Sequence, residues 1–578
     1  MAPAMRPLAL LLILAGCSAA PTTDMNADQR FQAHAARVLE EVWQEFPELA
    51  VRNGNYKYAD QLTVPDQARR ERSVAFYDRQ LAALAQFDRA ALNPSNRVDL
   101  DILKNRFERN RWYIVTFKPW QWEPSFYNVG PDIDLVLDTE YAPLDTRLRQ
   151  TLARLANVPA YYTAAKASIS DPTAEHIDLA LRQNRGAARI FDDGLEKKVE
   201  SSDLSSEEKA LFKQRATAAK AAIDDYIAYL GTLKGTRNFR IGPELYQQKF
   251  AYDIQSGFTA EQLYQRALAE KAALHDSMEK RAQELWPKYM AGAPMPADRL
   301  VMIRAVLDEM AKHHVARDDF VSAVRKQVPE LEAFVRQKDL LDQDPTRPLV
   351  VRETPPFMRG SGAGASVSAA GPLNPTANTY YNVTPLDGFT AEQAESYLRE
   401  YNDWTLQILN IHEAIPGHYT QLMHANKSGS LVKSVFGNGS MIEGWAVFGE
   451  KVMMDAGYGG GTPEMWLAWM KWNLRAVLNT VLDYEIQTKD LSRDAAITMM
   501  TREAFQQQTE ATEKWRRATF TQVQLTSYYN GYAEITALRD EMRAKQGSAF
   551  SVKQFNNQFL SYGSAPVRSI RELMLAGQ

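Results

Sequence analysis

The sequence predicts a mainly α-helical protein in which two helical halves flank a cleft, with one small β element between them. Over long stretches, apolar residues recur three and four positions apart among Ala, Leu, Glu, Lys and Arg, which is typical of amphipathic helices. Strand signals gather in a single short segment past the middle of the chain. With 578 residues, 45% of them hydrophobic, the chain can bury a large core.

The N-terminus has the features of a secretory signal. A basic residue, Arg6, precedes an apolar run far shorter than the roughly 20 residues needed to cross a bilayer. The run ends in Leu-Ala-Gly-Cys, whose cysteine is Cys17 and which resembles a bacterial lipobox. We therefore predict that residues 1–16 are a signal peptide.

Cys17 is the only cysteine of the chain, so it has no disulfide partner within it, and we predict that it is lipidated. Residues 17–29 are mostly small and polar and are expected to form a tether. The lipid is the one expected contact with a membrane. Ser18 favours the periplasmic face of the outer membrane, by resemblance to lipoprotein sorting in enterobacteria. An ordinary signal peptide with a chance cysteine is the alternative.

The charge balance argues against nucleic acid as a partner. Lys and Arg number 67 and Asp and Glu number 71, giving a net charge of −4 without a long run of one sign. A nucleic-acid-binding protein is expected to carry a basic patch or an excess of positive charge.

Residues 30–346 are predicted to form an N-terminal helical region, because the amphipathic pattern repeats along them with few interruptions. The expected helices cover residues 30–46, 68–87, 97–112, 145–169, 176–191, 205–233, 259–286, 297–315 and 318–337.

The composition changes at residues 347–389, which are rich in Pro, Gly, Ser, Thr and Val. Two strands are predicted here, over residues 348–354 and 378–383. The glycine-rich stretch 360–366 between them lacks the Gly-Lys-Ser/Thr of a phosphate-binding loop and the pattern of a serine nucleophile elbow. We expect that stretch to be a flexible loop, and the segment as a whole to line the cleft.

Residues 390–578 are predicted to form the catalytic helical region. Thr390 and Gln393 have the spacing of a capping box, which indicates the start of a helix that continues through Trp404 into His412. Further helices are expected over residues 466–488, 492–508, 512–520 and 528–545.

Four residues of this region suit a zinc hydrolase: His412, Glu413, His418 and Glu443. Two neutral imidazoles and one carboxylate can fill three positions of a tetrahedral zinc ion and leave the fourth for water, whose pKa then falls to roughly 7. A second carboxylate beside the ion can act as general base, and Glu413 is placed for that role. We therefore expect one Zn²⁺ ion as cofactor.

The spacing of the two histidines requires a break in the helix. Histidines four positions apart share a helix face, but His412 and His418 are six apart and would differ by about 120° on a regular helix. Pro416 removes a hydrogen bond to the carbonyl group of His412, and Gly417 tolerates unusual dihedral angles. A bulge or break at Pro416–Gly417 is therefore expected to return His418 to the metal.

The string His-Glu-Ala-Ile-Pro-Gly-His at 412–418, with the Glu-Gly-Trp-Ala that begins at Glu443, resembles the bacterial lipoprotein family called domain of unknown function 885. A later part of the chain resembles the same family through Gln524, Tyr528, Gly531 and Arg539. Two positions depart from the family pattern. Gln487 stands where the family has a histidine after Asp483, and residues 521–523 lack the usual Pro-Gly.

That family is similar to the gluzincin metallopeptidases, and the resemblance implies a fold and a site. It implies that His412, His418 and Glu443 are metal ligands and that Glu413 is the base. Gluzincins commonly pair a strand beside the metal with the substrate backbone, which implies that Tyr380 and Tyr381 lie on such an edge strand. A plain structural hairpin is the alternative for that strand.

Other polar residues are candidates for the rest of the site. A tyrosine hydroxyl beside zinc can stabilise the oxyanion of a tetrahedral intermediate, and we predict this role for Tyr528. Arg475 and Arg539 are candidates for binding a substrate carboxylate. Glu450 follows Glu443 by two helical turns and is predicted to orient a ligand histidine, with a surface salt bridge as the alternative.

We therefore expect a zinc-dependent hydrolase of the cell envelope, and in its leading form a metallopeptidase that acts on peptides. A further alternative keeps the metal but changes the bond to an amide or ester that is not a peptide, and the sequence does not distinguish the two. The alternative from a different class is a lipid-anchored binding or assembly protein whose metal site is vestigial or structural.

Overall fold

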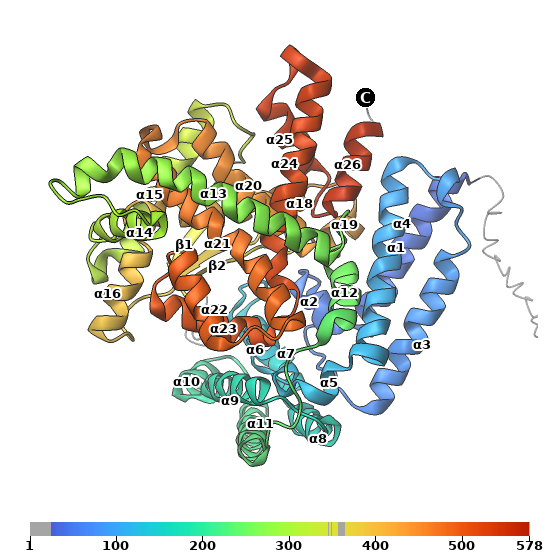
Figure 1. Cartoon of the computed structure of the whole chain (residues 1–578). Coiled ribbons are helices and arrows are strands. Elements are labelled where there is room, and N and C mark those ends of the chain that lie inside the picture. Colours follow the sequence, from blue (N-terminus) through green and yellow to red (C-terminus); the bar gives the residue numbers. More distant parts are fainter. Residues whose placement is uncertain (1–24, 345, 348, 356–363, 577–578) are drawn as a thin grey trace, which may run out of the picture.

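Helices make up most of the computed structural model, which describes residues 25–344, 346–347, 349–355 and 364–576 (Figure 1). The predicted fold class, a mainly helical protein with a small β element, is confirmed. The predicted signal peptide and Cys17 lie outside the described residues.

The large hydrophobic core is shared by helices from both ends of the chain. Its buried residues come from 31–136 and from 239–574, so the first helices pack with the last ones. In the N-terminal part, the helices of this core are α1 (Ala27–Glu45), α2 (Pro47–Arg52), α3 (Gln67–Leu84), α4 (Pro94–Trp112), α5 (Pro119–Trp122), α12 (Gly242–Asp253), α13 (Ala260–Tyr289), α14 (Arg299–Met310) and α15 (Phe320–Gln337).

A second, smaller core lies mostly within residues 127–230 and belongs to a group of helices at the bottom of Figure 1. The stretch predicted as one helix over 145–169 is two helices here: the first ends at Leu155, and the second begins at Val158 with Pro159 in its first turn. The helices are α6 (Gly130–Asp138), α7 (Leu144–Leu155), α8 (Val158–Ser168), α9 (Ala174–Ala188), α10 (Asp193–Glu200) and α11 (Ser206–Thr232).

The β element is a sheet of three strands: β1 (Leu349–Glu353), β2 (Ala365–Ser368) and β3 (Thr379–Val383). The order is β1-β3-β2, with β1 parallel and β2 antiparallel to β3. The strand expected to be an edge, β3, is therefore the central one, and that prediction is wrong. The edge on the other side is β2, which lies in the stretch expected to be a loop.

The C-terminal region contains eleven of the helices of the described residues. They are α16 (Ala391–Glu400), α17 (Thr405–Glu413), α18 (His418–Ala425), α19 (Leu431–Val435), α20 (Gly439–Asp455), α21 (Pro463–Thr488), α22 (Arg493–Thr498), α23 (Gln508–Phe520), α24 (Ser527–Gln546), α25 (Val552–Ser561) and α26 (Val567–Ala576).

The helix that carries His412 does not start at Thr390. The capping box at Thr390 is present, but it begins α16, which ends at Glu400. The Asn402 side chain then accepts hydrogen bonds of 3.2 Å from the amides of Trp404 and Thr405 and so begins α17 separately. The prediction of one continuous helix is wrong because an asparagine can satisfy the free amides at a new helix start.

Helices α20 and α24 cross in direct backbone contact. A Cβ atom on Gly531 would lie 1.9 Å from the carbonyl oxygen of Ser440, and one on Gly444 would lie 2.3 Å from Gly531. Only glycine fits at both positions. This contact places Glu443 of α20 and Tyr528 of α24 on adjoining turns of two helices that touch.

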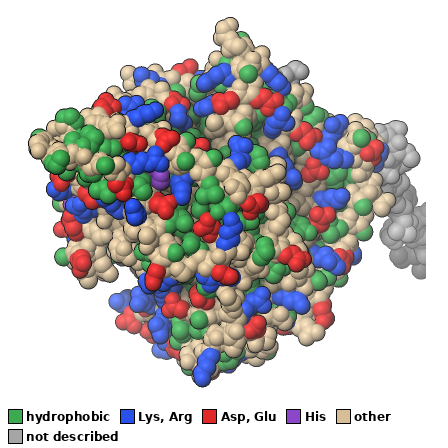
Figure 2. All heavy atoms as spheres, in the orientation of Figure 1, with side chains coloured by type: hydrophobic (Ala, Val, Ile, Leu, Met, Phe, Trp, Pro, Cys, Tyr) green, Lys and Arg blue, Asp and Glu red, His purple; other side chains and the backbone are tan. Residues whose placement is uncertain are grey.

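The surface mixes both signs of charge. On the face that Figure 2 shows, Lys and Arg side chains are interspersed with Asp and Glu. Among the described residues, none of the helices is both long and apolar enough to span a membrane.

Candidate metal centre

A helix break separates the two histidines. Helix α17 ends at Glu413 and α18 starts at His418, as expected from Pro416 and Gly417. The Gly417 amide donates to the carbonyl oxygen of Ile411 over 3.0 Å, and a Cβ atom on Gly417 would lie 1.9 Å from the carbonyl oxygen of His412. Glycine is therefore required here by the close approach of the backbone to the preceding helix.

The indole of Trp445 holds the break in place. Its Nε1 atom donates a 2.8 Å hydrogen bond to the carbonyl oxygen of Pro416, which is left without a helical partner by the break. Trp445 is 1% exposed and lies on α20, two residues after Glu443. The break and the helix that carries the carboxylate are thus joined directly.

Three donor atoms converge on one point. The Nε2 atoms of His412 and His418 lie 3.7 and 3.3 Å from Oε2 of Glu443. In a tetrahedral zinc site with bonds of about 2.0–2.1 Å, neighbouring ligand atoms are roughly 3.3–3.4 Å apart. The two separations from Glu443 are close to this value, so the three atoms fit the ligand positions of a zinc ion.

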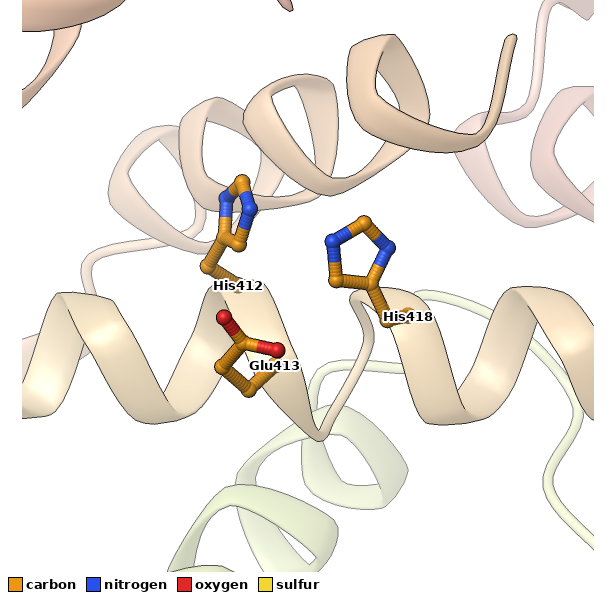
Figure 3. Close-up of side chains that lie close together, drawn as sticks. All are labelled: His412, Glu413 and His418. Carbon is orange, nitrogen blue, oxygen red and sulfur yellow. The ribbon is translucent and has the colours of Figure 1, made fainter. Parts of the chain in front are cut away.

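Glu413 lies beside the same point. Its carboxylate and the ring nitrogens of His412 and His418 lie within 4.8 Å of one another. Figure 3 shows the two imidazoles side by side across the helix break, with the Glu413 carboxylate below and between them. This is the position expected for a general base next to the metal.

The cluster has more negative charge than its histidines can balance. Burial would raise the pKa of the Glu443 carboxyl, but hydrogen bonds to the two imidazoles outweigh this and hold it well below its usual range. Burial would likewise lower the pKa of His412, but Glu443, Glu450 and Glu413 raise it well above its usual value. A divalent cation would supply the missing positive charge, so the donor set also fits a metal electrostatically.

Glu450 orients His412 from the far side. Its Oε1 atom lies 2.7 Å from Nδ1 of His412 and accepts a 2.9 Å hydrogen bond from the indole of Trp472. Glu450 is fully buried, so the alternative of a surface salt bridge is excluded. With Nδ1 bonded to a carboxylate, Nε2 of His412 faces Glu443, as metal-binding histidines usually require. Nδ1 of His418 has no partner among the described residues.

The cluster opens into a cavity of about 550 Å³, a size typical of small-molecule sites. All of its lining residues lie between 364 and 528, so the strand segment and the C-terminal region build it. The polar and charged lining residues are Ser366, Tyr401, His412, Glu413, His418, Glu443, Trp472, Arg475, Asn479, Lys514, Arg517, Thr521 and Tyr528.

Tyr528 lines the cavity beside the metal ligands. Its ring is roughly parallel to that of His412, with centroids 6.3 Å apart. Its hydroxyl oxygen accepts a 3.0 Å hydrogen bond from Nη2 of Arg517, and the phenol raises the pKa of Arg517. Among the described residues, no acceptor takes the hydroxyl hydrogen, so this hydrogen is available to a ligand.

The structure does not bring Tyr380 and Tyr381 to the cavity. Tyr381 is fully buried, and its hydroxyl donates a 2.6 Å hydrogen bond to Asn410, so it fastens the sheet to α17. Tyr380, on the opposite face of β3, stacks with the guanidinium of Arg352 at 3.9 Å. The central position of β3 explains both contacts. The strand that reaches the cavity is β2.

The two predicted arginines differ in position. Arg475 lines the cavity, but it forms an ion pair with Glu510 and so is already neutralised. Arg539 is not among the lining residues: its Nη2 atom lies 2.9 Å from Oδ1 of Asp540, and its Nη1 atom lies 3.9 Å from Oδ2 of Asp455. The structure thus gives Arg539 a role in helix packing rather than in substrate binding.

Two basic residues of the cavity, Lys514 and Arg517, are absent from the sequence-based prediction. They lie three positions apart on α23 and therefore share a helix face. Phe520, another three positions on, lines the same cavity. The spacing of these three residues indicates a shared helix face, but the sequence does not show that this face lies at the site.

A helical scaffold with a broken helix, two convergent histidines and three nearby glutamates forms a candidate metal-binding site. A family model described as "Bacterial protein of unknown function (DUF885)" matches residues 47–574. Because that match covers most of the chain, the protein belongs to this family.

Two solved structures share the fold. One, from Shewanella oneidensis, has 51% sequence identity and a TM-score of 0.83, covering 94% of this chain and 99% of that one. The other, from Colwellia psychrerythraea, has 15% identity and a TM-score of 0.77, covering 96% and 100%. Both are described as "putative" lipoproteins, the first "of unknown function". A comparison with curated proteins gives no match.

Proposed function

We propose that this protein is a zinc-dependent metallopeptidase of the cell envelope that hydrolyses short peptides. The observation that carries the proposal is the convergence of His412, His418 and Glu443, with Glu413 beside them, at the wall of a cavity. A purely structural metal site is usually closed by four protein ligands, whereas catalytic sites keep one position open.

The ligands would be Nε2 of His412, Nε2 of His418 and Oε2 of Glu443. A zinc ion bound there would polarise the scissile carbonyl group and lower the pKa of water to roughly 7. Glu413 takes the proton of the attacking water and delivers it to the leaving amine, which is the usual role of a general base and then acid. Glu450 keeps His412 in the orientation that this geometry needs.

Tyr528 would stabilise the oxyanion that forms during attack. Its hydroxyl hydrogen is free to donate, while Arg517 holds the oxygen from the other side. Because the hydrogen bond from a charged donor polarises the hydroxyl group, Arg517 makes Tyr528 a stronger donor.

Strand β2 can hold the substrate backbone. The amide of Thr384 donates to the carbonyl oxygen of Gly364 over 3.0 Å, so Gly364 and Ser366 face β3 in the antiparallel register. The N–H and C=O groups of Ala365 and Val367 then point to the outer edge, where no strand of the described residues pairs. An extended peptide can add to this edge, which lies at the cavity.

The N-terminus and the relatives support a location at the cell envelope. The lipobox-like sequence before Cys17 and the description of both structural neighbours as lipoproteins support a lipid anchor at the cell envelope. We place the enzyme at the periplasmic face of the outer membrane, with the lipid as its membrane contact.

The proposal is tested by the zinc content of purified residues 18–578, measured by mass spectrometry beside cleavage of a peptide library. We expect one zinc ion per chain and cleavage that a chelator abolishes. Replacing His412, His418 or Glu443 by alanine should remove both the bound zinc and the peptide cleavage. Glu413→Gln should keep the zinc and lower the rate by roughly 10²- to 10⁴-fold.

The matched control is His313→Ala, because His313 is an exposed histidine outside the cavity. This variant should retain zinc and activity. A parent protein that binds zinc but cleaves nothing in the library would favour a binding or assembly protein with a structural metal. A protein without zinc would overturn the site.

A further inference from the structure

One side of the cavity carries more positive charge than the acidic residues around it neutralise. Helices α21 and α23 contribute four basic side chains in or beside the cavity, and α16 and α23 contribute two acidic ones that pair with two of them. The basic residues are Lys471, Arg475, Lys514 and Arg517, and the acidic ones are Glu400 and Glu510.

The two glutamates form ion pairs with two of the four basic residues, Lys471 and Arg475. Glu400 lies 3.0 Å from Nζ of Lys471 and 4.0 Å from Nη1 of Arg475. Glu510 forms an ion pair with Nη2 of Arg475. This part of the network is therefore balanced, with two positive and two negative charges.

Lys514 and Arg517 remain without a carboxylate partner among the described residues. Lys514 is 5% exposed, and its Nζ atom donates to the amide oxygen of Asn479 over 2.9 Å. Arg517 donates to Gln524 over 2.8 Å and to Tyr528 over 3.0 Å. A buried ammonium group next to a guanidinium is unfavourable unless an anion joins them.

The electrostatics of Lys514 agree with a missing anion. Burial, followed by repulsion from Arg475, lowers the pKa of its amine well below the usual value; Glu510 and Glu400 oppose this effect without cancelling it, and Arg517 adds to it. A negatively charged group in the cavity would reverse the effect. Both cations line the same cavity as the metal cluster.

We propose that Lys514 and Arg517 form a subsite for the C-terminal carboxylate of the peptide substrate, so that the enzyme removes residues from free C-termini. This inference rests on the proposed function. A carboxylate supplies the charge and the acceptor oxygens that two such donors need, whereas an internal peptide segment would leave both cations unpaired.

The arrangement also indicates where the peptide is cut. Arg517 is hydrogen-bonded to Tyr528, whose ring lies next to that of the metal ligand His412. Lys514 is one turn before Arg517 on α23. The carboxylate subsite therefore adjoins the proposed oxyanion donor, so the peptide is expected to be cut near its C-terminus.

The test compares peptides that differ at the C-terminus alone. A mixture of N-acetylated pentapeptides is offered as free acids and as C-terminal amides, and the products are identified by mass spectrometry. We expect the acids to be cleaved roughly 10- to 100-fold faster, because charge-assisted hydrogen bonds are lost with the amides. Lys514→Met should remove the preference, and Lys514→Arg should keep most of it.

The control is Lys545→Met, the same change at a half-exposed lysine far along α24, which should leave the preference intact. Amides that end in Glu test whether a side-chain carboxylate can replace the terminal one. We expect that they are cleaved as slowly as the other amides.

Binding separates this inference from the proposed function. The same acids and amides are titrated into the Glu413→Gln protein, and binding is followed by ligand-observed NMR. The acids should bind at least roughly tenfold more tightly, and Lys514→Met should abolish the difference. If no peptide is cleaved but acids still bind through Lys514, the proposed hydrolysis fails and the carboxylate subsite stands.

Equal cleavage and equal binding of acids and amides would overturn the subsite. So would a preference for acids that persists in a folded Lys514→Met protein. If that variant fails to fold, as judged by its melting temperature, the comparison of acids and amides on the unmodified protein decides.

Discussion

The two sides of the cavity have opposite chemistry. The acidic side, formed by the two histidines with Glu413, Glu443 and Glu450, has an excess of negative charge. The basic side, formed by Arg475, Lys514 and Arg517, has an excess of positive charge. The remaining excess on each side indicates a ligand of opposite sign, a cation on one side and an anion on the other.

Opposite charges on facing groups also give a substrate its direction. A peptide whose carbonyl group lies at the metal and whose C-terminal carboxylate lies at Lys514 can bind in one orientation only. Electrostatic complementarity of this kind contributes more to specificity than to affinity.

Tyr528 lies between the two sides of the cavity, and removing its hydroxyl group should strongly reduce the rate of catalysis. In Tyr528→Phe, we expect kcat to fall by roughly 10²- to 10³-fold, because the oxyanion loses its donor, while KM changes little. Steady-state kinetics check this. The control is Tyr532→Phe, one turn later on α24 and outside the cavity lining, which should keep kcat. An unchanged kcat in Tyr528→Phe would remove this residue from the mechanism.

On the acidic side, Glu450→Gln tests whether the negative charge of Glu450, which contacts His412 but is not a proposed ligand, contributes to zinc affinity. The Gln side chain can still bond His412 but carries no charge, so we expect zinc affinity to fall by roughly 10- to 100-fold. Competition with a chromogenic chelator measures this. Trp472→Phe removes the other hydrogen bond to the same oxygen and keeps the charge, so its effect should be smaller. Equal effects of the two changes would show that orientation, rather than charge, is what Glu450 provides.

A change in the β-sheet, Tyr381→Phe, should affect stability but not catalysis. Tyr381→Phe removes the hydrogen bond to Asn410 and leaves a buried amide less satisfied, so the free energy of unfolding should fall by about 1–2 kcal/mol. Urea denaturation checks this value. The ratio of acid to amide cleavage should not change, because Tyr381 does not line the cavity. A changed ratio would return Tyr381 to the substrate site.

Most of the helices and the convergence of His412, Glu413 and His418 were predictable because their signals are local. The amphipathic spacing, the His-Glu pair and the Pro-Gly break each act over a few residues, and the break at Gly417 is enforced by a backbone contact within the same segment. The position of Glu450 could also be predicted, since it follows Glu443 by two helical turns and therefore lies on the same helix face.

What could not be predicted depends on contacts far apart in the sequence. Strand β2 is made of Ala, Ser and Val in a glycine-rich stretch, and it is a strand because β3 pairs with it. The same pairing makes β3 central and removes Tyr381 from the site. Arg539 was placed in the site by the family resemblance and by the ability of an arginine to bind a carboxylate, but it lies beside Asp455 of another helix.

The contact between Gly444 and Gly531 has a consequence for motion. Two helices whose backbones touch have no side chains between them that could rearrange, so α20 and α24 are expected to move as one body. Glu443 on α20 and Tyr528 on α24 are then expected to keep their relative positions when the rest of the protein moves. Any widening that admits a peptide is therefore expected from the other elements that line the cavity, which are β2, α17, α18, α21 and α23, rather than from a shift of α20 against α24.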